Sequence, residues 1–132
     1  MKQDDRAEQQ AQAQVESVTE MIETLQAAED AEADTDEAHE RIQEDPLSVQ
    51  VRSGWYIPGS SLADREPENF EILLCTGGPA VRIVGDLDQN LEPCDPVVEY
   101  QDWFTPWIEY GGLTNEQREA LQRYCECFYY GD

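Results

Sequence analysis

The residues best suited to chemistry or recognition lie together in segment 99–110. The segment holds three carboxylates and five aromatic rings, contributed by Glu99, Asp102, Glu109, Tyr100, Trp103, Phe104, Trp107 and Tyr110. Two facing carboxylic acids can act as the acid and base of glycoside hydrolysis, whereas Trp and Tyr are enriched at the centres of binding interfaces. The segment therefore indicates a hydrolytic carboxylate pair, an aromatic and acidic face for a partner, or the plug of a small core.

Other catalytic, metal or cofactor arrangements find little support. His39 is the only histidine, so histidine-based nucleophilic catalysis is not expected. Cys125 and Cys127 have one residue between them, which is shorter than zinc-site spacing. Segment 86–88 lacks the glycine and terminal glutamate of a calcium loop, and the glycines of 76–79 lead into a strand rather than a phosphate-binding helix. We therefore expect a protein that is not an enzyme and holds no metal or cofactor.

The charge balance restricts the kind of partner. The 132 residues contain 30 Asp and Glu but only 8 Lys and Arg, for a net charge of −22. Direct binding to nucleic acid needs clustered basic residues, which are absent from the sequence. A basic partner protein fits this charge, because complementary charge speeds encounter. The alternative is that the acidity only keeps the protein soluble.

The sequence indicates a cytoplasmic protein. No apolar run approaches the roughly 18 residues of a membrane-spanning helix, and the N-terminus has no signal-peptide core. The four cysteines, without a secretory signal, are expected to be reduced thiols.

Residues 1–45 are expected to form one acidic helix. Its apolar residues have the 4, 3, 4, 3 spacing of a heptad seam: Ala11, Val15, Val18, Ile22 and Leu25. This predicts a coiled-coil segment at 11–25 and a parallel homodimer, and the alternatives are a helix packed on its own domain or one frayed by self-repulsion. After residue 25 the seam changes phase, as at a three-residue insertion.

The remaining chain predicts a linker at 46–53 and a small α+β domain at 54–132. Apolar runs at 70–75 and 80–84 flank Gly77 and Gly78, the pattern of a β-hairpin, and a third strand is expected at 97–104. Thr114 and Gln117 predict a capping box for a C-terminal helix. We therefore expect a long N-terminal helix followed by a three-stranded antiparallel meander covered by a C-terminal helix. The apolar face expected for that helix consists of Leu121, Tyr124, Cys125 and Phe128.

The density of charge on a single helix falls short of that of DNA. The 15 acids and 3 bases of residues 1–45 give one net charge per roughly 5.6 Å of a single helix, against one per about 1.7 Å in duplex DNA. A parallel pair of helices would reach about one per 2.8 Å. DNA mimicry is therefore expected only from a dimer, or together with the acidic faces of the small domain. The acidic row expected to contact a partner is Glu16, Glu20 and Glu23.

Segments 70–85 and 100–107, FEILLCTGGPAVRIVG and YQDWFTPW, resemble a family of small, acidic proteins encoded by bacteriophages and prophages. The resemblance covers about residues 54–132 and implies a bacterial or phage origin. The family implies no activity and no site residues. Its context is that of small acidic inhibitors of host defence, of the anti-CRISPR or anti-restriction type.

We therefore expect a non-enzymatic interaction protein that occupies the basic surface of a host nucleic-acid-binding protein, with Trp107, Glu109 and Tyr110 as the strongest candidates for contact. The alternative function is a structural or assembly module in which the N-terminal helix is a multimerisation stalk.

Overall fold

The fold is given by a computed structural model that describes residues 4–55, 57–59, 67–76, 79–102 and 105–131. Within these residues, three helices and five strands follow one another along the chain. They are α1 (Asp4–Asp30), α2 (Asp36–Glu44), β1 (Ser48–Ser53), β2 (Pro67–Cys75), β3 (Ala80–Leu87), β4 (Pro93–Gln101), β5 (Ile108–Glu109) and α3 (Asn115–Glu126).

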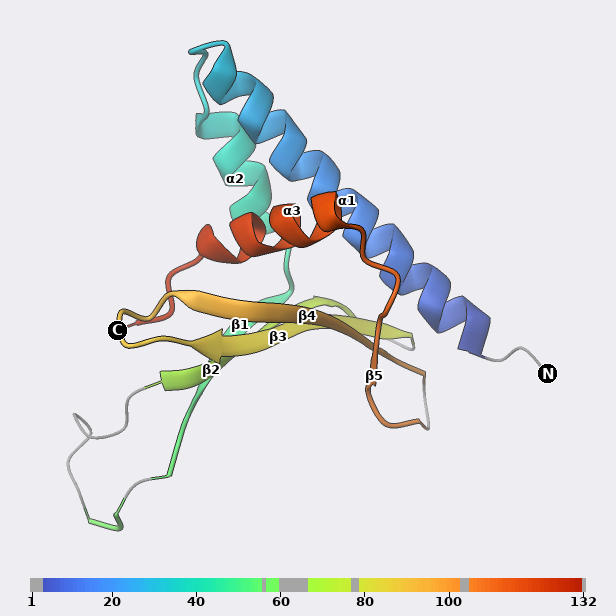
Figure 1. The fold of residues 1–132 in the computed structure, drawn as a ribbon, viewed down its shortest axis with the longest axis vertical. Coiled ribbons are helices and arrows are strands. Elements are labelled where there is room, and N and C mark those ends of the chain that lie inside the picture. The colour runs from blue at the N-terminus through green and yellow to red at the C-terminus, as the bar shows by residue number, and fades with distance from the viewer. Residues whose placement is uncertain (1–3, 56, 60–66, 77–78, 103–104, 132) are drawn as a thin grey trace.

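The strands form one antiparallel sheet in the order β1-β2-β3-β4-β5. The helices lie on one face of this sheet, and the tip joining α1 to α2 points away from it (Figure 1). The α+β class is as expected, but the prediction of a three-stranded meander is wrong, because β1 and β5 extend the meander at its two edges.

Alternating side chains explain the three central strands. Every second residue points toward the helices and is buried, and this row consists of Phe70, Ile72, Leu74, Val81, Ile83, Val98 and Tyr100. Such period-two patterning is typical of a strand with one face on the core. The strands expected at 70–75 and 80–84 are confirmed as a hairpin, although Gly77 and Gly78 lie outside the described residues.

The strand β1 occupies the segment expected to be a linker. Ser48 to Ser53 pair along β2, and the backbone N–H of Leu47 already donates to the carbonyl of Leu73. Only Val49 and Val51 are apolar in this strand, so its alternation is too short and too polar to stand out in the sequence. The expected linker at 46–53 is therefore corrected to an edge strand for residues 48–53.

The N-terminal acidic segment is two helices rather than one. After Asp30 the chain turns, with the Ala33 N–H donating to the Ala28 carbonyl and the Glu32 N–H donating to the Glu29 carbonyl. These bonds form the Schellman motif that ends helices, with Glu32 in the left-handed region at φ 54°. The change of phase noted after residue 25 therefore precedes a helix end, not an insertion.

The heptad seam is buried inside the molecule's own core. Ala11, Val15, Val18, Ile22 and Leu25 are each at most 6% exposed, and they belong to the same core cluster as the sheet and α3. Because α1 packs on α3, β3 and β4, this stripe is not available to a second chain. A coiled-coil dimer or stalk formed through these residues is therefore excluded in this fold.

The C-terminal helix has the predicted start and the predicted face. The Thr114 hydroxyl accepts from the Gln117 N–H at 3.1 Å, and the Gln117 side chain accepts from the Thr114 N–H at 2.9 Å. Leu121, Tyr124 and Cys125 are buried, and Phe128 packs against them from just beyond the helix. The capping box and this apolar face are confirmed.

Shortening one seam side chain tests whether α1 is part of the core. Leu25→Ala should lower the free energy of unfolding by about 2–5 kcal/mol, because it leaves a cavity beneath α1. Denaturant unfolding of the full chain measures this loss. Gln12→Ala, at an exposed position of the same helix, should change the value by less than about 0.5 kcal/mol; equal effects of the two variants would contradict the packing described.

Candidate interaction surfaces

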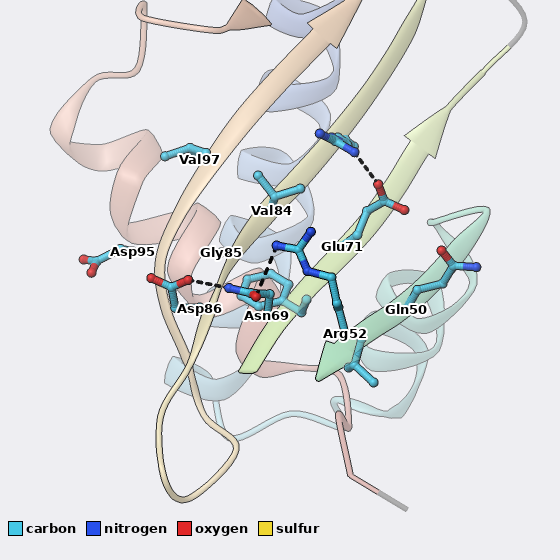
Figure 2. A pocket seen from close by; sticks show the side chains of 12 residues that line it. Gln50, Arg52, Asn69, Glu71, Val84, Gly85, Asp86, Asp95 and Val97 are labelled. Carbon is cyan, nitrogen blue, oxygen red and sulfur yellow. Dashed lines mark hydrogen bonds and ion pairs between the residues drawn. The ribbon is translucent and has the colours of Figure 1, made fainter. Parts of the chain in front are cut away.

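The face of the sheet turned away from the helices carries two rows of polar side chains. In the first row, Arg52 donates to the Asn69 side-chain oxygen at 3.2 Å, and the Asn69 amide donates to Asp86 at 2.6 Å (Figure 2). This row crosses β1, β2 and β3 above an open depression of about 470 Å³. Since these side chains already form hydrogen bonds with one another, the depression offers a polar surface and no side chain prepared to act as a nucleophile, acid or base.

The second row is centred on Arg82 of β3. Its guanidinium bridges Glu71 of β2 at 2.6 Å and Glu99 of β4 at 2.7 Å. The Trp107 ring lies over the same guanidinium, 4.1 Å from its centroid, which is the geometry of a cation–π contact. One arginine therefore holds three strands and the β4–β5 connection together.

The aromatic, acidic segment is distributed over different environments. Glu99 and Trp107 are committed to Arg82. Tyr110 is buried in the core, so it cannot anchor a partner in this fold. Glu109 is exposed on β5 directly opposite Glu99, and Asp102 is half-buried, with its backbone N–H donating to the Thr105 hydroxyl.

Trp103 and Phe104 lie outside the described residues. Of the aromatic rings proposed for partner contact, Trp107 and Tyr110 are placed by the structure, and neither is an exposed anchor. Of the three carboxylates considered for hydrolysis, Glu99 is held in an ion pair with Arg82.

The acidic row on α1 faces solvent. Glu16, Glu20 and Glu23 are exposed. Glu20 accepts from Arg41 of α2 at 3.2 Å, and this contact shows that α2 runs back beside the C-terminal part of α1. We call residues 20–45 the acidic hairpin.

Folding back raises the charge density of the acidic hairpin. Residues 20–45 contain eleven acids and one arginine, a net charge of −10. They share about 20 Å of helix axis, turn included, which gives one net charge per about 2 Å. A single chain therefore comes close to the charge density of duplex DNA, which the single helix expected from the sequence did not.

The thiols show no activation. Burial raises the pKa of Cys75, Cys125 and Cys127. Desolvation and the neighbouring carboxylates of Asp88 and Asp95 raise the pKa of Cys94. A raised pKa leaves less of the thiolate, which is the nucleophile and metal ligand. Among the described residues, no group of three or more His, Cys, Asp or Glu side chains could hold a metal ion.

Sequence reasoning missed the exposed apolar residues around β1. Trp55 is fully exposed and Ile57 is 77% exposed, just beyond that strand. A signal was present: residues 46–63 contain no Asp or Glu, in a chain with 30 such residues. The acidic protein thus has one long segment whose only charge is Arg52, and none of the residues described in it is buried.

Comparisons with protein-family models, with curated proteins and with solved structures gave no match to this chain. In the part of the chain that the structure describes, no helix is both long enough and apolar enough to cross a membrane.

Removing the central arginine tests the second polar row. Arg82→Gln should lower the free energy of unfolding by about 1–3 kcal/mol, because it leaves the partly buried carboxylates of Glu71 and Glu99 without their cation. Arg52→Gln is the matched control on the same face, and should cost less than about 0.5 kcal/mol. Thermal or denaturant unfolding measures the stability of both variants. An equal loss of stability would show that Arg82 contributes no more to the fold than Arg52 does.

Proposed function

We propose that this chain is a non-enzymatic interaction protein whose acidic hairpin occupies the basic surface of a nucleic-acid-binding protein. The support is the place and density of the charge. The hairpin tip points away from the sheet (Figure 1), so a partner can approach it without disturbing the core, and its charge density is close to that of a duplex.

One observation carries this proposal: acids stand where they weaken the fold. The last turn of α1 has no basic residue. Glu29 in that turn pairs with Arg123 of α3, whereas Asp30 and, just beyond the helix, Glu32 are exposed to solvent. Negative charge at a helix C-terminus is unfavourable by about 0.3–1 kcal/mol per residue. Glu32 also occupies a left-handed position that favours glycine. Acids needed only for solubility could stand at other surface positions without lowering the stability of the fold. We therefore attribute the acids at the end of α1 to binding.

The resemblance to phage and prophage proteins sets the proposed context. In that context the partner is a bacterial defence protein that handles nucleic acid, and inhibition is of the anti-CRISPR or anti-restriction type. The acidic hairpin would act as a DNA mimic, occupying the surface of the partner that otherwise binds nucleic acid. The multimerisation stalk is not carried forward, since the seam it required is buried.

Affinity purification from a bacterial lysate at low salt tests the proposal. Recovery of a nucleic-acid-binding protein that duplex DNA displaces would support it. Recovery of no such protein would end it.

Neutralising the hairpin should weaken that capture. The variant combines Glu23→Gln, Asp30→Asn, Glu32→Gln and Glu37→Gln, all at exposed positions. We expect the dissociation constant for the captured protein to rise at least about tenfold, and its dependence on salt to become shallower, because fewer charges face the basic surface.

A matched control keeps the change in net charge but moves it off the hairpin. It combines Glu8→Gln, Glu68→Gln, Glu92→Gln and Asp95→Asn, also exposed. Its dissociation constant should stay within about twofold of the unmodified protein at physiological salt. If both variants weaken binding equally, net charge rather than the hairpin is responsible.

The turn itself gives a test that separates stability from binding. Glu32→Gly should raise the free energy of unfolding by about 0.5–1 kcal/mol, because glycine accepts the left-handed backbone and removes an acid from the helix C-terminus. Binding to the captured partner should weaken at the same time. Ala33→Gly, the neighbouring control, should slightly destabilise the protein; a destabilising Glu32→Gly would contradict the strain argument.

A further inference from the structure

We propose that the outer edge of β1 binds an extended segment of the partner protein, adding a sixth strand to the sheet. The segment would have apolar side chains at alternate positions and Lys or Arg at the end next to α2. This inference rests on the proposed function only for the basic character of the partner.

The strand β1 has an unpaired edge. It is the first strand in the sheet order, and within the described residues its outer side forms no backbone hydrogen bond with another segment. An edge with free N–H and C=O groups is a template for one more strand, and proteins commonly protect it with Lys, Pro, inward-pointing charges or bulges. Residues 48–51 carry none of these, and the register irregularity comes only at Arg52 and Ser53.

An apolar shelf accompanies this edge. The helix α1 packs on β3 and β4, and α3 packs on β4. The strand β1 lies at the margin of the face that they cover, with Val49 partly buried against the core. Leu47 and Val51, two residues before and two residues after Val49 and so on the same side of the chain, are 59% and 45% exposed. Of the six exposed large hydrophobic side chains among the described residues, four lie in segment 46–63. An added strand places every second side chain on this same side.

Charge decides between the candidate occupants. A second copy would bring a further −22 to the same interface, and such repulsion opposes self-association. A basic segment instead meets an edge free of acids, and α2, which precedes β1 in the chain, carries the exposed carboxylates of Glu40 and Glu44. These carboxylates favour Lys or Arg at the end next to α2, while the exposed Trp55 ring stands beyond the other end of the strand.

Selection from a displayed library of random nine-residue peptides, panned against the full chain, tests the proposal. Enriched peptides should show alternating apolar residues with Lys or Arg at one end. A synthetic enriched peptide should slow the hydrogen exchange of β1 amides at least about tenfold, and N-methylation of alternate peptide nitrogens should abolish binding by removing donors to the edge.

Two variants locate the contact. Leu47→Gln with Val51→Gln removes the shelf without changing charge, and should weaken peptide binding at least about tenfold. Ile108→Gln, at an exposed apolar residue of the opposite edge strand, should leave binding within about twofold. Glu40→Gln with Glu44→Gln should weaken it about three- to tenfold and reduce its salt dependence.

Defined results would overturn the inference. These are the absence of enriched peptides, enrichment without alternation, protection outside β1, equal binding to the shelf variant, or a dimer that protects β1 without peptide. The hairpin variant keeps Glu40 and Glu44, so it should bind the peptide normally. The two proposals can therefore fail separately. If the chain captures no nucleic-acid-binding protein from the lysate but binds the peptide, the hairpin proposal fails; if it captures such a protein but binds no peptide, the β1 proposal fails.

Discussion

The structure depends on the burial of one apolar stripe along α1. Ala11, Val18 and Leu25 are at most 2% exposed, and they fill the space between α3 and the central strands. Without them, the helix-side face of the sheet would be covered mainly by the 12 residues of α3. The same burial turns the charged side of α1 to solvent, so the packing of the core also decides which acids a partner can reach.

The features that sequence reasoning found are those set by local patterns. Two apolar runs flanking Gly77 and Gly78 identified the hairpin of β2 and β3, and Thr114 with Gln117 identified the start of α3, because these signals lie within a few residues of one another. The partner of the α1 stripe could not be read in this way. A heptad spacing is compatible both with packing on a second chain and with packing on the molecule's own sheet. Which of the two occurs depends on contacts between residues far apart in the sequence.

The sequence predicted which residue types the candidate surfaces contain, but not where in the fold these surfaces lie. Acidity was evident from the sequence, whereas its concentration depends on Glu32, whose left-handed backbone turns the chain where propensity favours continuing the helix. Trp107 was chosen as an exposed ring, yet strand register brings Arg82 beneath it. The edge strand β1 escaped notice because its two valines are a weak signal, while the missing acids around it are a clear one.

The buried stripe also has a consequence for biosynthesis. Glu29 and Arg123 are bonded although 94 residues separate them, so α1 leaves the ribosome long before α3 and β4 exist to cover it. During that interval its apolar side is exposed, and contacts so distant in the chain form late. The carboxylates of the hairpin emerge with it, and their mutual repulsion keeps nascent chains apart until the C-terminal helix arrives.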